Sequence, residues 1–342
     1  GTEKRGLMLE SLHCYLFLDL HCVDAYIDWF ESDVVIDMND VSLLFAKVLK
    51  RVPRLNRFAC KYNMYRHEKL MQRIEEVALQ ASELSSVAGE GSANYGPIWV
   101  FWWQGVDNAP LRVKACISSI RRNSNGRQVI VITQSNVREY TNLPDYIFSK
   151  LADGNITLTH FSDILRFNLL HLHGGIWMDA TLYVVRPLTS TRYSGSFFTC
   201  SGYPDPTFFN VADGKWTGFF IGGCENESLF AFMNQFFLAY WKNNDQLIDY
   251  FLIDYALKYA YDHEIGSLRS WCENERGQDN PALFDLAPIV SEPFDEKKWS
   301  ELTERTDVFK LSWKKPSSYP EGSFGDRLVK EMFFDKTEGN AL

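Results

Sequence analysis

The stretch HFSDILRFNLLHLHGGIWMDATLYVV, residues 160–185, decides the fold and raises the main chemical question. Its apolar spacing predicts a helix over 160–172, which two glycines end, and the apolar run after them predicts a strand over 176–185. Three charged residues lie among these apolar ones: Asp163, Arg166 and Asp179. A buried charge is costly unless it is paired or used. We therefore predict a functional site in this stretch.

Two other apolar runs extend the pattern. PIWVFWWQG (97–105) and RQVIVIT (127–133) are nearly continuous, as is typical of strands buried on both faces. Between them, residues 109–124 have helical spacing, with a proline near the start. This alternation predicts an α/β fold with a largely parallel sheet. Ligands of such folds bind beyond the carboxyl ends of the strands.

The rest of the chain divides by composition. We predict a mostly helical N-terminal region over 1–84, a linker rich in Ser, Gly and Ala over 85–96, the main domain over 97–320 and a disordered C-terminal tail over 321–342. Helix is predicted again over 226–261, with Asp249 and Asp254 on one long helix.

The composition excludes some classes of protein. The 342 residues are 46% hydrophobic, enough for a sizeable core, and the net charge of −9 argues against a nucleic-acid partner. Seven scattered cysteines without a CxxC pair suggest reduced thiols and a cytoplasmic location. No apolar run reaches the roughly 18 residues of a membrane-spanning helix. GxSxG, HExxH and GKT/S motifs are absent from the sequence, so hydrolase and P-loop interpretations lack support.

Positive charge is concentrated in residues 47–73, which hold nine Lys and Arg against one acidic residue, Glu68. Leu55, Phe58 and Tyr65 are interleaved with the basic residues. This pattern fits a segment that lies on an anionic membrane surface, near a lipid-linked acceptor. It also fits a solvated helix face docked on the protein's own acidic surface, and both interpretations stay open.

The charged residues of the central stretch suit a sugar diphosphate. Asp163 and Arg166 are three residues apart and share a helix face, either as a structural ion pair or as ligand contacts. In the predicted strand, Asp179 and Thr181 point to the same side because side chains alternate. Phosphates need positive charge, which Arg or a divalent cation held by oxygen ligands supplies, and sugar hydroxyls need buried acceptors. We therefore predict a site for a nucleotide-sugar and a divalent cation.

Three blocks of sequence, FWWQG, NAP and SDILR…GGIWMDA, resemble the signature of bacterial capsular polysaccharide synthesis glycosyltransferases. These are similar to the wider class of sugar transferases in which Ser-Asp-x-x-Arg precedes Gly-Gly-x-x-x-Asp-x-Asp. The resemblance covers roughly residues 97–315. It implies a Rossmann-like domain of the GT-A fold that moves a hexose from a nucleotide-sugar, with a UDP-sugar as the expected donor and Mn²⁺ or Mg²⁺ as the expected cofactor. It also implies retention of configuration and a lipid-linked saccharide acceptor of a surface polysaccharide, at the inner face of the plasma membrane.

The resemblance also assigns roles to residues. Asp163 and Arg166 match the donor-contacting pair, and Asp179 matches the first Asp of the DxD motif. Thr181 stands where that motif has its second Asp, and a neutral hydroxyl is a weaker ligand for a hard cation than a carboxylate. Three alternatives follow for the expected cation. Its affinity is low, a residue later in the chain completes its ligand shell, or the reaction does not need it. Asp179 and Thr181 are the predicted metal ligands.

Further donor contacts and one catalytic residue complete the prediction. The donor contacts are Trp102, Trp103, Gln104, Gly174, Gly175, Ser312 and Lys314, with core packing as the alternative for the two tryptophans. Asp254 is predicted to bind the acceptor or act as a base, the alternative being a solvated carboxylate. Together with Asp163, Arg166 and Asp179, it forms the predicted catalytic set.

Two other function classes stay open. A transferase of the same fold could glycosylate a protein, as toxins and effectors do, with the N-terminal helices binding the partner. The missing second Asp also fits a nucleotide-sugar binder with weak or absent catalysis.

Overall fold

The structure of the protein, a computed structural model, describes residues 38–85, 96–189, 191–225, 227–274, 280–314 and 318–338. The chain divides into two compact units, Gly1–Phe45 and Ala46–Leu342. The described part of the first unit is the beginning of helix α3, and all other described elements belong to the second unit. Most of the predicted linker lies outside the described residues.

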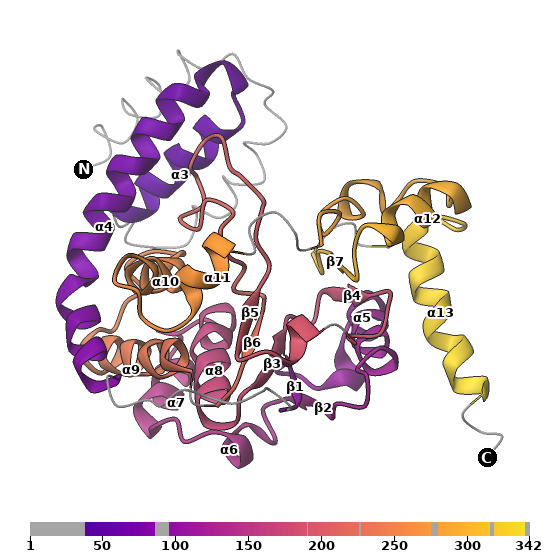
Figure 1. The fold of residues 1–342 in the computed structure, drawn as a ribbon, viewed down its shortest axis with the longest axis horizontal. Helices are drawn as coiled ribbons and strands as arrows, with labels where there is room; N and C mark the ends of the chain where they lie inside the picture. The colour runs from indigo at the N-terminus through magenta and orange to yellow at the C-terminus, as the bar shows by residue number, and fades with distance from the viewer. Residues whose placement is uncertain are drawn as a thin grey trace. The chain divides into compact units, whose positions relative to one another are not determined.

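The described chain contains both helices and strands, which Figure 1 shows with their labels. The strands are β1 (Ile98–Phe101), β2 (Val129–Ile132), β3 (Gly175–Met178), β4 (Leu182–Val184), β5 (Phe197–Thr199), β6 (Phe220–Gly223) and β7 (Val308–Lys310). The α-helices are α3 (Met38–Lys50), α4 (Asn56–Ser85), α5 (Leu111–Arg122), α6 (Val137–Tyr140), α7 (Asp145–Ala152), α8 (Leu158–His173), α9 (Ser228–Asn243), α10 (Leu252–Asp262), α11 (Leu268–Asn274), α12 (Glu296–Glu304) and α13 (Phe324–Glu338). Short 3₁₀ helices are η2 (Pro53–Leu55), η3 (Val106–Asn108), η4 (Thr191–Ser194) and η5 (Ala287–Ile289).

Five strands form the central sheet, in the order β2-β1-β3-β6-β5. Strand β1 is parallel to both β2 and β3, with Trp99 opposite Ile130 and Trp177. Strand β6 is antiparallel to β3 and to β5, so β5 runs in the same direction as β3. The prediction of an α/β fold with a largely parallel sheet is confirmed, whereas its GT-A type stays a prediction.

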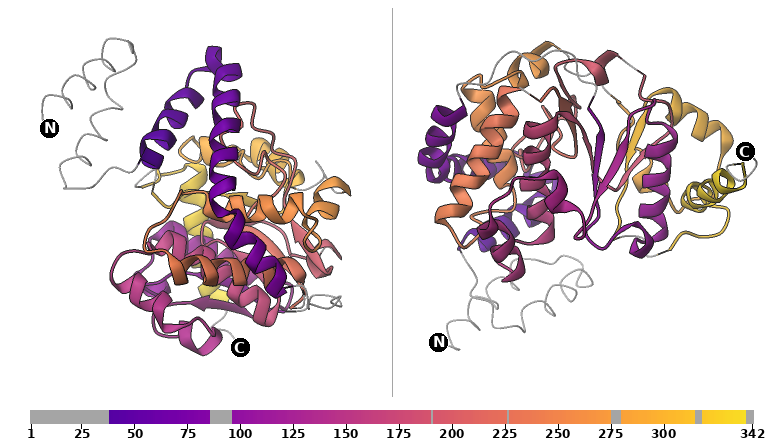
Figure 2. Two further views of the ribbon diagram at one scale, coloured as in Figure 1. Left: turned by 90° about the vertical axis from the view of Figure 1, so that its left-hand side faces the viewer. Right: turned by 90° about the horizontal axis from the view of Figure 1, so that it is seen from below.

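The sheet buries a different set of side chains on each face. Trp99 and Trp177 point to one face and join a core with residues of α4, α8, α9 and α10. Ile98 and Ile176 point to the other face and pack with α5. Figure 2 shows the sheet between these two groups of helices. Because both faces are covered, β1 and β3 are apolar at every position rather than at every second one.

Helix α4 is part of this layered unit and not of a separate N-terminal region. Pro53, which lacks an amide hydrogen, lies in η2 between α3 and α4. Helix α4 then packs against α9 and α10 and buries Leu70, Ile74 and Ala78 in the main core. The division between units therefore falls between Phe45 and Ala46, well before the predicted linker.

The strand predicted over 176–185 is two strands in two sheets, which corrects the prediction. Strand β3 ends at Met178, and a turn follows in which the Leu182 amide donates to the Asp179 carbonyl over 2.9 Å. Strand β4 then pairs with β7 in a separate antiparallel sheet, with Leu182 opposite Lys310. Asp179 and Thr181 thus lie in the connection between two sheets.

The prediction of a disordered tail over 321–342 is wrong for the residues of α13. This helix buries Phe324, Leu328 and Met332 in a core that includes residues of α5. Among the helices of the described chain, none combines the length and the apolar character that crossing a membrane requires.

Candidate functional site

The carboxyl ends of β1 and β3 bring two predicted site segments together. Trp102, Trp103 and Gln104 follow β1, and Asp179 follows β3. Because β1 and β3 are neighbouring parallel strands, both segments lie at the same edge of the sheet. Ligands of α/β folds bind at this edge.

Asp179 is the centre of the site. Its Oδ2 accepts a hydrogen bond of 2.6 Å from Lys310 Nζ, and its Oδ1 accepts one of 3.0 Å from Trp177 Nε1. Arg166 Nη2 lies 3.5 Å from the same Oδ1. Burial alone would raise the pKa of Asp179, but the charges of Lys310 and Arg166 outweigh burial and lower the pKa below its usual value. Asp179 is thus held as an anion.

Helix α8 presents Asp163 and Arg166 on one face, as predicted. The helix begins after Thr157, whose hydroxyl accepts a hydrogen bond of 3.2 Å from the His160 amide. Arg166 Nη1 lies 3.1 Å from Asp163 Oδ1, and the Arg166 guanidinium covers the Trp177 ring at 5.0 Å. The Arg166 side chain is 5% exposed, and its Nε has no hydrogen-bond partner within the described part of the chain. The buried pair therefore retains hydrogen-bonding capacity.

Lys310 is a site residue that the sequence analysis missed. It ends β7, and its register opposite Leu182 places its Nζ 2.9 Å from Thr181 Oγ1 as well as near Asp179. The Phe219 ring lies 4.5 Å from the ammonium group. Lys310 is 131 residues from Asp179 in the chain, so the pairing of β4 with β7 is what brings them together. No local sequence signal marks that pairing.

The aromatic residues after β1 have different surroundings. Trp102 forms an edge-to-face pair with Trp313 at 5.9 Å, and its buried indole Nε1 has no partner among the described residues. Trp313 is 47% exposed. Trp103 packs in the core against Phe161, which is the alternative that the sequence left open. Gln104 is exposed. Trp313 therefore offers an exposed aromatic ring beside the end of β1, and Trp102 packs against its edge.

Gly174 and Gly175 are not brought to this edge. Gly174 precedes β3 and Gly175 is its first residue, whereas Asp179 follows the carboxyl end of the strand. Their φ angles are 60° and 101°, and a Cβ on Gly175 would lie 2.3 Å from the Pro97 carbonyl oxygen. The two glycines therefore turn the chain tightly from α8 into β3.

Ser312 and Lys314 lie on the segment after β7, on either side of Trp313. Both are exposed, and the Lys314 amide donates to Ser312 Oγ over 3.3 Å. The segment borders the site through the contact of Trp313 with Trp102. Contact of these two residues with a donor stays a prediction.

The helix predicted over 226–261 is broken, so Asp249 and Asp254 do not share one helix. Helices α9 and α10 are separated by residues 244–251, which contain Asp249. Asp249 is buried in an ion pair with Arg66 of α4. This carboxylate has a structural partner and is not part of the site.

Asp254 lies in the first turn of α10, close to the site. Its Oδ1 accepts a hydrogen bond of 3.0 Å from Trp216 Nε1. Burial raises the pKa of Asp254 to about 6, with a further contribution from the negative charge of Asp163, against the opposing influence of Trp216 and Arg166. Of the two acids weighed from the sequence, Asp254 is the one near the charged cluster.

The predicted metal ligands do not form a fitting site for Mn²⁺ or Mg²⁺. Such ions take about six oxygen ligands and favour carboxylates. Here the Asp179 carboxylate and the Thr181 hydroxyl both bond to Lys310, and Arg166 adds a second positive charge. Across the described ranges, no group of three His, Cys, Asp or Glu side chains is placed to hold a metal. Metal dependence stays a prediction, and these ligands do not support it.

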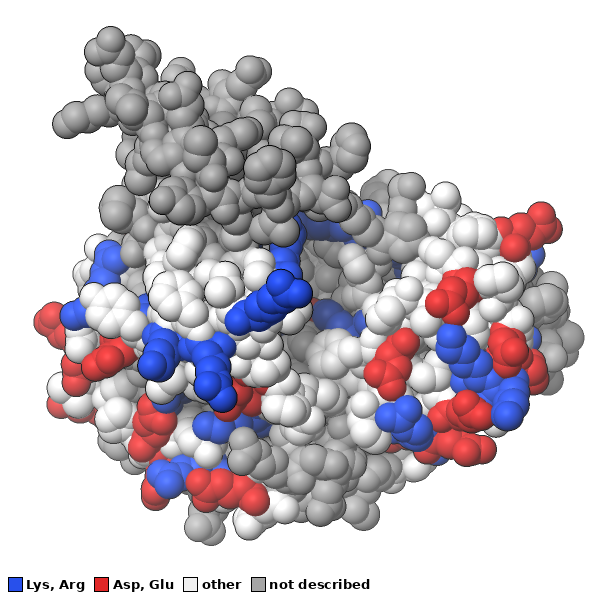
Figure 3. Space-filling view, turned by 90° about the horizontal axis from the view of Figure 1, so that it is seen from above, with Lys and Arg blue, Asp and Glu red and all other residues white. Residues whose placement is uncertain are grey.

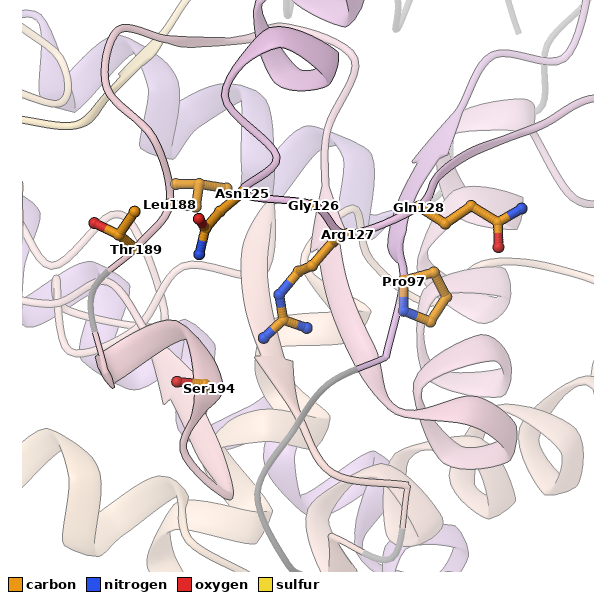
Figure 4. A pocket seen from close by; sticks show the side chains of 8 residues that line it. All are labelled: Pro97, Asn125, Gly126, Arg127, Gln128, Leu188, Thr189 and Ser194. Atoms are coloured by element: carbon orange, nitrogen blue, oxygen red, sulfur yellow. The ribbon is translucent and has the colours of Figure 1, made fainter.

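A hollow of about 510 Å³ lies at the opposite edge of the sheet (Figure 4). Pro97 and Gln128, which line it, precede β1 and β2. Arg127, also in its lining, donates to the carbonyls of Gly96 and Tyr193 over 2.6 and 2.7 Å. Because this hollow is at the amino ends of the strands, it is separate from the site around Asp179.

The chain is similar to the glycosyltransferase afumC of Aspergillus fumigatus, with 30% identity over 130 residues, which cover 32% of this chain and 33% of that protein. It is also similar to the O-glycosyltransferase braB of Annulohypoxylon truncatum, with 31% identity over 98 residues, or 26% of this chain and 23% of the relative. The chain thus matches a third or less of each of these relatives. Both are fungal, so the bacterial character of the resemblance stays a prediction.

The family match is much longer. Residues 50–328 match the model of a family described as capsular polysaccharide synthesis protein. The matched region includes every residue assigned above to the site, from Trp102 to Lys314. The chain therefore belongs to the capsular polysaccharide synthesis protein family.

Proposed function

We propose that this protein is a glycosyltransferase that moves a hexose from a nucleotide-sugar to a hydroxyl group. Membership of the family and similarity to two proteins named as glycosyltransferases support the reaction class. The observation that carries the proposal is Asp179, held between Lys310 and Arg166 at the carboxyl end of β3. Two cations at this edge suit a diphosphate, and the neighbouring carboxylates suit sugar hydroxyls.

The proposed donor is a nucleoside diphosphate sugar, with a UDP-sugar as the first candidate on the strength of the resemblance. Trp313 offers an exposed ring for the base or ribose, and Trp102 supports it by an edge-to-face contact at 5.9 Å. Asp163, 14% exposed, offers a carboxylate to the sugar. Asp163 and Arg166 would thus bind the sugar end of the donor, and Trp102 with Trp313 would bind its nucleoside end.

The proposed reaction retains the anomeric configuration. The bond between C1 and the phosphate oxygen breaks, and its electron pair stays on the departing diphosphate. The acceptor oxygen forms its bond to C1 on the same face, and its proton passes to the departing phosphate oxygen. Asp254 orients the acceptor hydroxyl by accepting its hydrogen bond. Retention rests on the resemblance, and the role of Asp254 rests on its place beside Asp163 and Arg166.

The proposed acceptor is a lipid-linked saccharide of a surface, capsular-type polysaccharide, met at the cytoplasmic face of a membrane. A basic-aromatic stripe supports membrane contact, and we define it as Arg54, Phe58, Lys61, Tyr65 and Lys69. From Phe58 onward its members follow helical spacing, so they share one face of α4. All five residues are exposed, with Phe58 at 54% and Tyr65 at 61%.

The exposure of the stripe favours the membrane interpretation over docking on the protein's own acidic surface. Figure 3 shows Lys and Arg side chains gathered left of centre, over the N-terminal end of α4. Apolar rings among basic groups bind anionic lipid surfaces through both burial and charge. Among the Lys and Arg residues of the described α4, Arg66 alone is buried, in its pair with Asp249.

Vesicle co-sedimentation tests the stripe. We expect the full chain to bind phosphatidylglycerol-containing vesicles and to lose most of this binding when Lys61 and Lys69 are both replaced by Glu. The control is Lys297→Glu, a lysine 87% exposed on α12. Equal binding to pure phosphatidylcholine, or no effect of the charge reversal, would exclude an electrostatic membrane contact.

The substitution Asp179→Asn tests the proposed function itself. We expect it to lower sugar transfer by about a hundredfold or more, because it removes the charge that holds Lys310 and Arg166 in place. The measured quantity is release of nucleoside diphosphate from a panel of nucleotide-sugars, with donor affinity followed by thermal shift. The matched control is Asp145→Asn, an acid 87% exposed on α7. Near-normal turnover of Asp179→Asn would refute the proposed site.

A further inference from the structure

We propose that the ammonium group of Lys310, and not a divalent cation, supplies the positive charge that neutralises the donor diphosphate. This inference rests on the proposed function and specifies how its site binds the donor. Lys310 Nζ lies 2.6 Å from Asp179 Oδ2 and 2.9 Å from Thr181 Oγ1. These are the two residues predicted as metal ligands, so the ammonium group holds the position between them.

The charge balance of the site matches an ammonium ion better than a metal. One carboxylate, Asp179, neutralises one ammonium, and Lys310 and Arg166 already engage it, whereas Mg²⁺ needs one or two carboxylates that are free to coordinate it beside the phosphate oxygens. Thr181 gives a neutral hydroxyl oxygen, which suffices to accept an N–H bond from Lys310. Thr181 stands where the DxD motif has its second Asp, so the position carries one negative charge fewer. The single positive charge of Lys310 matches this better than the double charge of a metal ion.

The surrounding charges also disfavour a divalent cation. Arg166 lies 3.5 Å from Asp179 and would repel any metal bound to that carboxylate. Asp163 is engaged with the same guanidinium at 3.1 Å. A metal would have to expel Lys310 and then share Asp179 with Arg166.

Lys310 retains capacity for a ligand. A lysine ammonium has three N–H donors, and Asp179 and Thr181 accept two of them. The side chain is 21% exposed, so the third N–H is within reach of a phosphate oxygen from solvent. The Phe219 ring and the pairing of β7 with β4 fix the ammonium group in advance. When the bond between C1 and phosphate breaks, this N–H and Arg166 stabilise the charge on the departing diphosphate.

Calorimetry with a panel of common nucleoside diphosphates, in EDTA and in Mn²⁺, tests the inference. We expect the wild-type chain to bind its nucleoside diphosphate with the same affinity in both conditions. Lys310→Met, which keeps the aliphatic stem, should weaken binding at least about tenfold, and Lys310→Arg should weaken it less because the charge is retained. The control is Lys297→Met, a lysine 87% exposed on α12 and outside the proposed site. Circular dichroism and the Tm show that each variant is folded.

The outcomes separate this inference from the proposed function. Binding in Mn²⁺ that EDTA abolishes would overturn the inference and leave the proposed function intact, as would unchanged binding by folded Lys310→Met. Absence of binding to every nucleoside diphosphate in both conditions would overturn both. The double variant Lys310→Met/Thr181→Asp gives an independent measurement. By electron paramagnetic resonance it should gain Mn²⁺ binding that the wild type lacks, and Mn²⁺ binding by the wild type would contradict the inference.

Discussion

Asp254 is a carboxyl group whose ionisation the fold opposes. Burial raises its pKa from 3.8 to about 6, and Asp163 adds to the effect. The folded protein therefore binds this proton more tightly than the unfolded chain does. The ionised group lowers stability above pH 6, and this cost is relieved as the pH falls from 6 toward 3.8. A group held at such a cost beside a charged site is a candidate for function.

The substitution Asp254→Asn separates function from stability. Asn can still accept the Trp216 hydrogen bond, and it carries no charge. We expect the variant to be more stable at pH 8, by up to about 3 kcal/mol, and at least about tenfold less active. Wild-type activity should fall as the pH drops below about 6, because protonation removes the negative charge that makes Asp254 a strong acceptor for the hydroxyl hydrogen bond. Urea unfolding and a pH–rate profile measure the two effects. A variant with wild-type activity and the same acidic limb would rule out this role.

The predicted site residues that the structure brings together around Asp179 are close in the chain. Asp163 and Arg166 lie one helical turn apart, and a tight turn of two glycines carries α8 into the short strand before Asp179. Lys310 comes from a strand of three residues, whose partner β4 is far away in the sequence. Its place depends on a strand register, which local patterns do not determine. Lys314, chosen instead from the same segment, lies beyond the end of that strand.

A buried polar network joins α4 to the start of α10. Arg66 pairs with Asp249, and Arg66 Nη1 also donates to the Tyr255 hydroxyl over 3.3 Å. The His67 ring contacts the same hydroxyl at 2.8 Å and the Phe208 carbonyl at 2.8 Å. Burial lowers the pKa of His67 to about 4, so the ring is neutral at pH 7. The network fixes α4 beside the helix that carries Asp254.

The ion pair of this network gives a prediction about stability. Arg66→Met should lower the free energy of unfolding by about 3–5 kcal/mol, because it leaves the buried charge of Asp249 without its guanidinium. The double variant Arg66→Met/Asp249→Asn should recover part of this loss, since no charge then stays buried. Lys69→Met, on the exposed face of α4, should change stability by less than about 0.5 kcal/mol. Urea unfolding followed by circular dichroism gives all three values. Equal stability of Arg66→Met and Lys69→Met would show that the pair is not structural.

Polar side chains explain why one predicted helix is two. After α9, the Asn244 side chain donates to the Tyr240 carbonyl over 2.8 Å. Before α10, Asp249 Oδ1 accepts from the Phe251 amide over 2.9 Å. Such side chains compete with the helical hydrogen bonds of the backbone, and they favour helix ends. The sequence predicted helix on both sides correctly because the apolar spacing there is regular. The same spacing gave no indication of the break between α9 and α10.

The whole molecule assembles its site from segments far apart in the sequence. The sheet is covered on both faces, so its strand ends are where side chains of β1, α8, β3, α10 and β7 meet. The alternation of strands and helices predicted that edge. The pairing of Trp102 with Trp313 and of Lys310 with Asp179 depends on long-range packing. Both pairs lie at the carboxyl ends of β1 and β3, the edge of the sheet where we propose that the donor binds.

The most direct test of this account is a crystal structure of the full chain with the nucleoside diphosphate that calorimetry selects. We expect the diphosphate to lie at the carboxyl ends of β1 and β3, within hydrogen-bond distance of Lys310 Nζ, with the base against Trp102 or Trp313. A diphosphate bound at the opposite edge, in the hollow beside Pro97 and Arg127, would contradict it.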